Sequence, residues 1–147
     1  MGSSNRKLFG LWNNSDAIQL AYPKENIPFE RTDNGKPVDS TIYKLPESED
    51  ELVTYSVYMG GDIGETVITT NRPELPNILI YGDSFTNPLE ALLWTQANEL
   101  RSIDFRHYTE CTLKDYIAEY KPDIVICVRD ETTFFVRRRE RNHGMSL

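Results

Sequence analysis

The segment Tyr81-Gly82-Asp83-Ser84-Phe85 brings a hydroxyl, a carboxylate and a glycine together at one turn. A serine hydroxyl becomes a nucleophile when a base removes its proton, usually a histidine that a carboxylate orients. Acyl transfer also needs N–H donors for the oxyanion that forms, and glycine turns commonly supply them. We therefore take Ser84 as the candidate nucleophile. The amides of Gly82, Gly61 and Ser84 itself are candidate oxyanion donors.

Further polar groups follow the next two expected strands. Arg106 and His107 come after the second strand, and Arg129, Asp130 and Glu131 come after the third. Because the carboxyl ends of neighbouring strands in an open α/β sheet share one crevice, we expect these groups near Ser84. His107 is the candidate base and Asp130 a pocket residue.

A purely structural interpretation of the same residues remains open. Serine and aspartate are common in strand-to-helix turns because their side chains bond the local backbone. A histidine that follows a strand is often only a surface residue. Asn87, however, is expected to cap the helix after the turn, with proline at its first position. Ser84 is then not needed as a cap, which favours the catalytic interpretation.

The second half of the chain alternates between strand and helix patterns. The expected order is strand Asn77–Tyr81, helix Pro88–Arg101, strand Ser102–Arg106, a helix that Thr112 caps and Lys121-Pro122 ends, and strand Ile124–Val128. Strands separated by helices at this spacing require crossover connections. The pattern predicts an α/β fold of three layers, with a mainly parallel sheet and helices on both faces.

The first half is less regular. Residues 1–51 are polar with isolated apolar positions, and we expect an irregular segment with short strands that packs on or wraps the domain. Leu52–Met59 and Thr66–Thr70 have strand composition, and Gly60-Gly61-Asp62 between them predicts a tight turn. The α/β core is expected to span 52–136, and 137–147 to form a basic tail.

Composition excludes several classes of function. The net charge is -7, and four of the arginines lie in the last eleven residues, so the body of the chain is acidic. This argues against nucleic acid as a partner, because phosphate binding needs clustered lysine and arginine. The two cysteines, Cys111 and Cys127, and two separated histidines form no metal-ligand spacing, so we expect no metal and no cofactor. No stretch reaches the length of a transmembrane helix.

The block Ile78–Phe85 resembles the first motif of the SGNH (GDSL-like) hydrolase superfamily, in which the serine is the nucleophile. Segments 55–62, 82–85, 103–108 and 121–126, in that order, resemble the C-terminal portion of the bacterial DHHW family, relatives of alginate O-acetyltransferase-like domains. The resemblance implies an SGNH/flavodoxin-like fold and a family that is generally exported. It also implies that Asp83 shapes the turn and that Gly61 and Asp62 line the pocket.

The chain departs from this family at the base. The Asp-His-His-Trp segment that names the family, and resembles the source of its catalytic Asp and His, is missing from these 147 residues. Glu140-Arg141-Asn142-His143 copies the Asp-x-x-His spacing of the wider superfamily with Glu for Asp, but it lies in the basic tail and we interpret it as coincidence. Either the chain is a fragment whose base lies elsewhere, which we expect, or the site is degenerate.

Two functions follow from these residues. The first is acyl transfer, of esterase or carbohydrate O-acetyltransferase type, on a small ester or carbohydrate through an acyl-Ser84 intermediate. The second is a non-catalytic carbohydrate or cell-surface binding module on the same scaffold. That alternative needs an exposed aromatic platform, for which Trp12, Trp94, Tyr55 and Tyr58 are the candidates.

Overall fold

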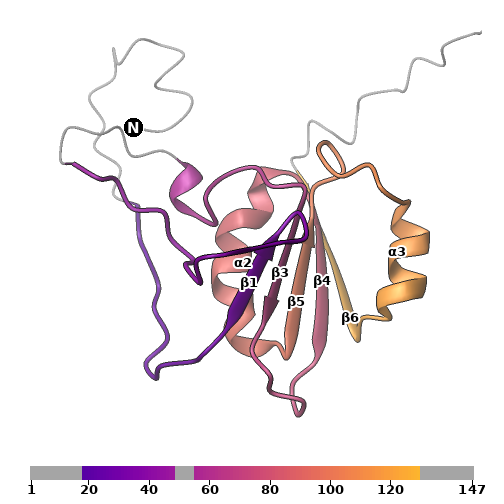
Figure 1. Cartoon of the computed structure of the whole chain (residues 1–147), viewed down its shortest axis with the longest axis horizontal. Coiled ribbons are helices and arrows are strands. Elements are labelled where there is room, and N and C mark those ends of the chain that lie inside the picture. The colour runs from indigo at the N-terminus through magenta and orange to yellow at the C-terminus, as the bar shows by residue number, and fades with distance from the viewer. Residues whose placement is uncertain (1–17, 49–54, 130–147) are drawn as a thin grey trace, which may run out of the picture.

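The computed structural model describes residues 18–48 and 55–129, and one sheet of six strands organises them (Figure 1). The strands are β1 (Glu30–Asp33), β2 (Lys36–Val38), β3 (Glu65–Thr69), β4 (Asn77–Gly82), β5 (Glu99–Ile103) and β6 (Ile124–Val128). Their order across the sheet is β2-β1-β3-β5-β4-β6. Two α-helices connect the last three strands: α2 (Asn87–Leu93) and α3 (Leu113–Tyr120). No described helix is long and apolar enough to cross a bilayer.

The α/β class is confirmed, but the sheet is mixed. β4 pairs in parallel with both β5 and β6, as the alternating pattern predicts. The β1–β2, β1–β3 and β3–β5 pairings are antiparallel. β1, β2 and β3 come from the first half of the chain, where a tight turn at Asn34-Gly35 joins β1 to β2 without a crossover helix. Both turn residues have positive φ, at 49° and 72°.

Two apolar cores lie on opposite faces of the sheet, so helices cover both faces as predicted. Ile78 and Ile80 of β4 face α2, together with Trp94 and Leu100. Leu79, between them in the strand, faces the other side and packs in a cluster with residues of α3. Such alternation in one strand is what a sheet buried on both sides requires.

The boundary between α2 and β5 differs from the prediction. The helix ends at Leu93, a 3-10 turn follows at Trp94–Gln96, and Glu99 already belongs to β5. Leu100 has the spacing of a helical position, but it lies in the sheet opposite Ile78 and is 1% exposed. Tertiary pairing thus overrides helical periodicity here. β5 consequently ends at Ile103, and the predicted strand end at Arg106 lies in the turn that follows.

Other local predictions had mixed outcomes. Thr112 caps α3 by accepting the Asp115 N–H, and β6 has the predicted bounds. Asn87 does not cap α2, because it is itself the first helical residue and Thr86 precedes it. Instead of a strand at 52–59, the described part of that segment forms a 3-10 turn at Tyr55–Val57.

Candidate functional site

A surface cavity of about 570 Å³ opens beside Ser84 at the carboxyl end of β4. It brings together three of the predicted site residues: Ser84, Gly61 and Asp62. The full lining is Tyr55, Ser56, Gly60, Gly61, Asp62, Ser84, Phe85 and Asn87. The cavity therefore lies between the turn that follows β4 and the glycine turn that precedes β3.

Close packing of the backbone positions Ser84. A Cβ added to Gly82 would lie 1.7 Å from the Val128 carbonyl oxygen, so β4 can approach β6 this closely only with glycine at that position. Asp83 then accepts the Phe85 N–H at 3.1 Å and caps the 3-10 helix Ser84–Thr86. The Asp83 side chain thus holds the turn in which Ser84 lies.

The Ser84 side chain is half-buried and faces the cavity. Among the residues that the structure describes, its hydroxyl makes no hydrogen bond. Its backbone N–H lies at the first position of the 3-10 helix, where N–H groups have no partner within the helix. Asp83 caps this 3-10 helix, and Thr86, not Asn87 as predicted, is the residue before α2, so Ser84 caps neither helix.

The glycine turn opposite Ser84 has an unusual backbone. Gly60 and Gly61 have φ values of +86° and +106°, which residues with a side chain rarely adopt. Asn87 donates its side-chain amide to the Gly61 carbonyl at 3.1 Å and so ties this turn to the start of α2. The Gly61 N–H donates to the Tyr58 carbonyl at 3.2 Å, so this candidate oxyanion donor is already engaged within its turn.

A buried arginine holds the other side of the glycine turn. Arg31 of β1 donates to the Met59 carbonyl at 2.6 Å and to the Thr41 carbonyl at 2.6 Å. Asp33 pairs with the same guanidinium through both carboxylate oxygens, each at 2.9 Å. Thr66 donates its hydroxyl to the Asp33 carboxylate, also at 2.9 Å. The glycine turn is thus fixed by long-range bonds on both sides.

A cluster of charges lies at the rim of the cavity. His107 Nε2 is 3.9 Å from a carboxylate oxygen of Asp62, and Arg106 lies 3.4 Å from the same oxygen. The His107 side chain is 49% exposed and is not part of the cavity lining. The structure therefore places His107 beside Asp62, a residue that lines the cavity with Ser84.

Arg106 is held mainly by Asp104. Burial alone would raise the pKa of the Asp104 carboxyl, but the hydrogen bonds from Arg106 outweigh burial and lower that pKa. Asp104 also accepts the Arg106 backbone N–H at 2.9 Å, which closes the turn after β5. This turn sets the position of His107, the next residue.

Two aromatic side chains lie at the cavity: Tyr55, a candidate for the aromatic platform, and Phe85, which was not predicted. Tyr55 and Phe85 are 41% and 55% exposed, and their ring centroids are 6.4 Å apart. Burial, followed by the charges of Tyr58, Asp83 and Glu90, raises the pKa of Tyr55, so its hydroxyl remains a donor at neutral pH. Ser56, Gly60 and Asn87 were likewise missed as lining residues, although each is within five residues of Gly61 or Ser84 in the sequence.

One further candidate, Trp94, lies away from the cavity lining. Trp94 is 4% exposed and packs against Phe29 with ring centroids 4.5 Å apart, so it is a core residue and not a platform. Asp130, Trp12 and His143 lie outside the described residues. Within residues 18–48 and 55–129, no group of three acidic, histidine or cysteine side chains could hold a metal ion.

Comparison with solved structures shows what the fold is similar to. Bacillus cereus PatB1 with a sulfonyl adduct has a TM-score of 0.63 and 25% identity over 76% of this chain and 39% of its own. Another PatB1 structure has a TM-score of 0.64 and 23% identity over 82% of this chain and 45% of its own. A DHHW family protein from Eubacterium siraeum has a TM-score of 0.54 and 21% identity over 69% of this chain and 35% of its own.

The chain thus spans less than half the length of these neighbours. No family model matches the sequence, and no curated protein matches it. The similarity to a DHHW family protein agrees with the family that the sequence resembles, at the level of the fold.

Proposed function

We propose that the cavity beside Ser84 is an acyl-transfer site of esterase or O-acetyltransferase type, with an SGNH-like arrangement, and that its substrate is a small ester or a carbohydrate. The observation that carries the proposal is the Ser84 hydroxyl itself. It is accessible from the cavity, makes no hydrogen bond to a described residue, and starts a 3-10 helix whose first N–H can stabilise an oxyanion.

In the proposed reaction, the Ser84 oxygen attacks the ester carbonyl while its proton passes to a base. The tetrahedral oxyanion is stabilised by the Ser84 N–H and by the Asn87 amide, which carries two N–H donors and uses one on Gly61. The carbonyl then re-forms, the alcohol leaves with the proton, and an acyl-serine remains. Attack by water gives an esterase, and attack by a sugar hydroxyl gives an O-acyltransferase.

His107 is the candidate base within the described chain, with Asp62 as the carboxylate beside it. His107 does not line the cavity, so a direct role requires the imidazole to move towards Ser84, and catalytic contacts are often long before substrate binds. If a base from outside these residues acts instead, as in the expected fragment, Ser84 still forms the covalent intermediate. The two cases therefore differ in the effect of changing His107 and not in the role of Ser84.

The neighbour that carries a sulfonyl adduct suggests a direct probe. Sulfonyl fluorides form adducts with activated nucleophilic side chains. We expect phenylmethanesulfonyl fluoride to label this chain once, at Ser84, as located by peptide mass spectrometry. Ser84→Ala should abolish the label and lower p-nitrophenyl acetate turnover by about 10³-fold or more.

Ser56→Ala is the matched control, because this serine lines the same cavity and the substitution removes the same atom. Ser56→Ala should keep both the label and the turnover. Labelling of Ser56 in place of Ser84, or turnover unaffected by Ser84→Ala, would show that Ser84 is not the nucleophile.

His107→Gln tests the base separately. If His107 removes the Ser84 proton, the substitution should lower kcat by about 10²–10⁴-fold with little change in KM. Circular dichroism should show an unchanged fold, since the side chain is half exposed. An unchanged kcat assigns the base to a group other than His107.

The exposed pair Tyr55 and Phe85 supports the second candidate, a carbohydrate-binding module. Aromatic faces at the mouth of a cavity can stack on sugar rings without catalysis. Under this alternative, Ser84 is not labelled, but Tyr55→Ala or Phe85→Ala weakens oligosaccharide binding measured by calorimetry.

A further inference from the structure

Four buried polar side chains connect the turn that contains Ser84 to the centre of the sheet. Thr86 and Asn87, at the start of α2, are 4% and 6% exposed. Glu90, one helical turn further along α2, is 3% exposed, and Ser102 of β5, which contacts it, is 7% exposed. Buried polar groups need hydrogen-bond partners, and leaving one without a partner costs stability. The reaction proposed above uses only Asn87, so the roles of the other three remain to be explained.

These side chains form a chain of hydrogen bonds that ends at the cavity. The Ser102 hydroxyl donates to Glu90 Oε1 at 2.6 Å. The Thr86 hydroxyl is hydrogen-bonded to the Glu90 carboxyl and also donates to Asn87 Oδ1 at 3.4 Å. Asn87, which lines the cavity, donates its side-chain amide to the Gly61 carbonyl at 3.1 Å. The contact between Thr86 and Asn87 is long for a hydroxyl hydrogen bond, so a small change in its surroundings decides whether it is kept.

The protonation of Glu90 decides which groups in this chain receive a hydrogen. A threonine hydroxyl carries one hydrogen, and two acceptors compete for that of Thr86: the Asn87 amide oxygen and the Glu90 carboxyl. A protonated Glu90 donates its own hydrogen to the Thr86 oxygen, which leaves the Thr86 hydrogen for Asn87. An ionised Glu90 is only an acceptor, so it takes the Thr86 hydrogen, and the buried Asn87 oxygen loses its donor.

The surroundings of Glu90 favour the protonated form. Burial raises the pKa of its carboxyl, and the two hydroxyl groups that contact it offset this only in part. Arg31 and Asp33 of β1 also act on Glu90, but in opposite directions, and they pair with each other at 2.9 Å. At the cavity, the charges of Asp83 and Glu90 both raise the pKa of the Tyr55 hydroxyl. No ion pair therefore compensates an ionised Glu90 among the described residues.

We propose that Glu90 is a positioning residue of the cavity: when protonated, it acts through the Thr86 hydroxyl to hold the Asn87 amide in the orientation that stabilises an oxyanion beside Ser84. As the pH rises and the Glu90 proton passes to solvent, the Thr86 hydrogen turns to the carboxylate and the Asn87 amide is released. The effect on catalysis rests on the function proposed above, whereas the hydrogen-bond chain does not depend on it.

Nuclear magnetic resonance of the isotope-labelled chain tests the hydrogen-bond chain without any reaction. In the wild type, the Glu90 carboxyl carbon should titrate above the ordinary pKa of 4.5, and the Asn87 side-chain amide resonances should shift with the same midpoint. Thr86→Val keeps the shape of the side chain and removes its hydroxyl. In this variant Glu90 should still titrate, but the Asn87 resonances should no longer follow it.

The pH profile of p-nitrophenyl acetate turnover tests the effect on the reaction. In the wild type, kcat should fall by up to about 10²-fold as the pH rises through the Glu90 midpoint, because an oxyanion donor is displaced. Glu90→Gln should lack this fall, since its amide donates to Thr86 at every pH and its oxygen still accepts from Ser102. Glu119→Gln, at an exposed position of α3, is the matched control and should keep the wild-type profile.

Several results would overturn the positioning role: a Glu90 that keeps one protonation state while the protein stays folded, Asn87 resonances that stay fixed while Glu90 titrates, or Asn87 resonances that still follow Glu90 in Thr86→Val. A fall in kcat that Glu90→Gln retains would overturn the effect on the reaction. Asn87 resonances that follow Glu90 in a protein without turnover support the hydrogen-bond chain and contradict the acyl-transfer proposal, so the two failures are distinguishable.

Discussion

Gly82 shows how a single residue can set the geometry of the candidate site. Its α-carbon lies against the Val128 carbonyl, and the next two residues are Asp83 and Ser84. The absence of a side chain therefore decides how closely β4 approaches β6 and where the serine turn begins. This requirement is steric and does not depend on a left-handed backbone conformation.

We predict that Gly82→Ala destabilises the fold by about 1–3 kcal/mol or more, because the new methyl group overlaps the Val128 carbonyl oxygen and the strands must separate. Urea denaturation measures the effect. Gly35→Ala is the comparison: its new Cβ meets nothing within 4 Å, but its φ of +72° costs an L-residue about 1–2 kcal/mol. A loss below about 1 kcal/mol at Gly82 would contradict the steric explanation.

At the scale of elements, a carboxyl group is buried where α2 packs against β5. Glu90 of α2 is 3% exposed and accepts the Ser102 hydroxyl of β5 at 2.6 Å. Burial raises the pKa of Glu90, and the hydrogen bonds from Ser102 and Thr86 offset this only in part. The Glu90 carboxyl thus binds a proton more tightly in the folded protein than in the unfolded chain.

The stability that Glu90 contributes is therefore present at pH values below its ordinary pKa of 4.5, and it is lost as the pH rises through the higher pKa of the folded state. Glu90→Gln keeps an oxygen for Ser102 and carries no charge. We expect this variant to melt a few degrees above wild type at pH 7, with the difference vanishing towards pH 4. Thermal melts over this pH range measure it.

Glu119→Gln, at an exposed position of α3, should leave the pH dependence of the melting temperature unchanged. A Glu90→Gln variant less stable than wild type at pH 7 would mean that the folded state favours the charged carboxylate.

The chain between α2 and β5 is also where the prediction of elements from the sequence was wrong. The positions 89, 92, 93, 97 and 100 fit one helical face, and a helix to Arg101 follows from that periodicity. In the structure the chain leaves the helix after Leu93, and Leu100 enters the centre of the sheet between β3 and β4. Periodicity cannot separate these outcomes, since a buried strand residue and a buried helix residue are equally apolar. α3 was predicted correctly because Thr112 and Pro122 mark its ends locally.

At the scale of the whole molecule, Arg31 connects parts that are distant in sequence. Its guanidinium is bonded to β1, to the segment before Tyr43 and to the turn beside the cavity, and its side chain is 5% exposed. Removing one partner from a buried ion pair leaves a buried charge without compensation. The network therefore stabilises both the N-terminal strands and the glycine turn.

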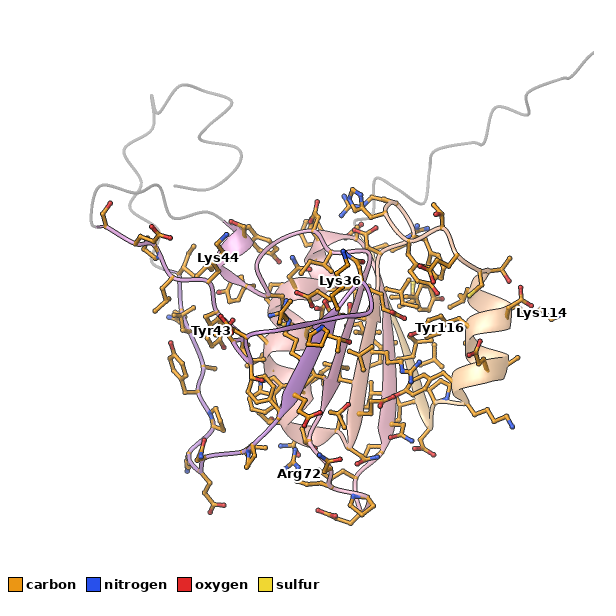
Figure 2. The ribbon with its side chains drawn as sticks, in the orientation of Figure 1. Lys36, Tyr43, Lys44, Arg72, Lys114 and Tyr116 are labelled. Carbon is orange, nitrogen blue, oxygen red and sulfur yellow. The ribbon has the colours of Figure 1, made fainter. Side chains whose placement is uncertain are left out.

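We predict that Arg31→Met lowers the free energy of unfolding by about 3–5 kcal/mol. The double variant Arg31→Met/Asp33→Leu should lose less than the single variant, because it leaves no unpaired carboxylate. Chemical denaturation measures both. Lys36→Met on exposed β2 removes a nearby positive charge and should change stability by no more than about 0.5 kcal/mol (Figure 2). A loss at Lys36 equal to that at Arg31 would indicate a general charge effect.

The sequence by itself determined the α/β class, the parallel β5-β4-β6 unit, the caps of α3, and Ser84 with its glycine turn as the candidate site. These features rest on local signals: apolar runs, capping residues and turn residues close together in the chain. Only the tertiary structure decided that β1, β2 and β3 extend the sheet with antiparallel pairs, that α2 is short, and that His107 lies beside Asp62 at the cavity. It also showed that Arg31 and Asn87 hold the glycine turn. Each of these features depends on contacts between residues that are far apart in the sequence. Such contacts produce no periodic pattern and no local motif from which they could be predicted.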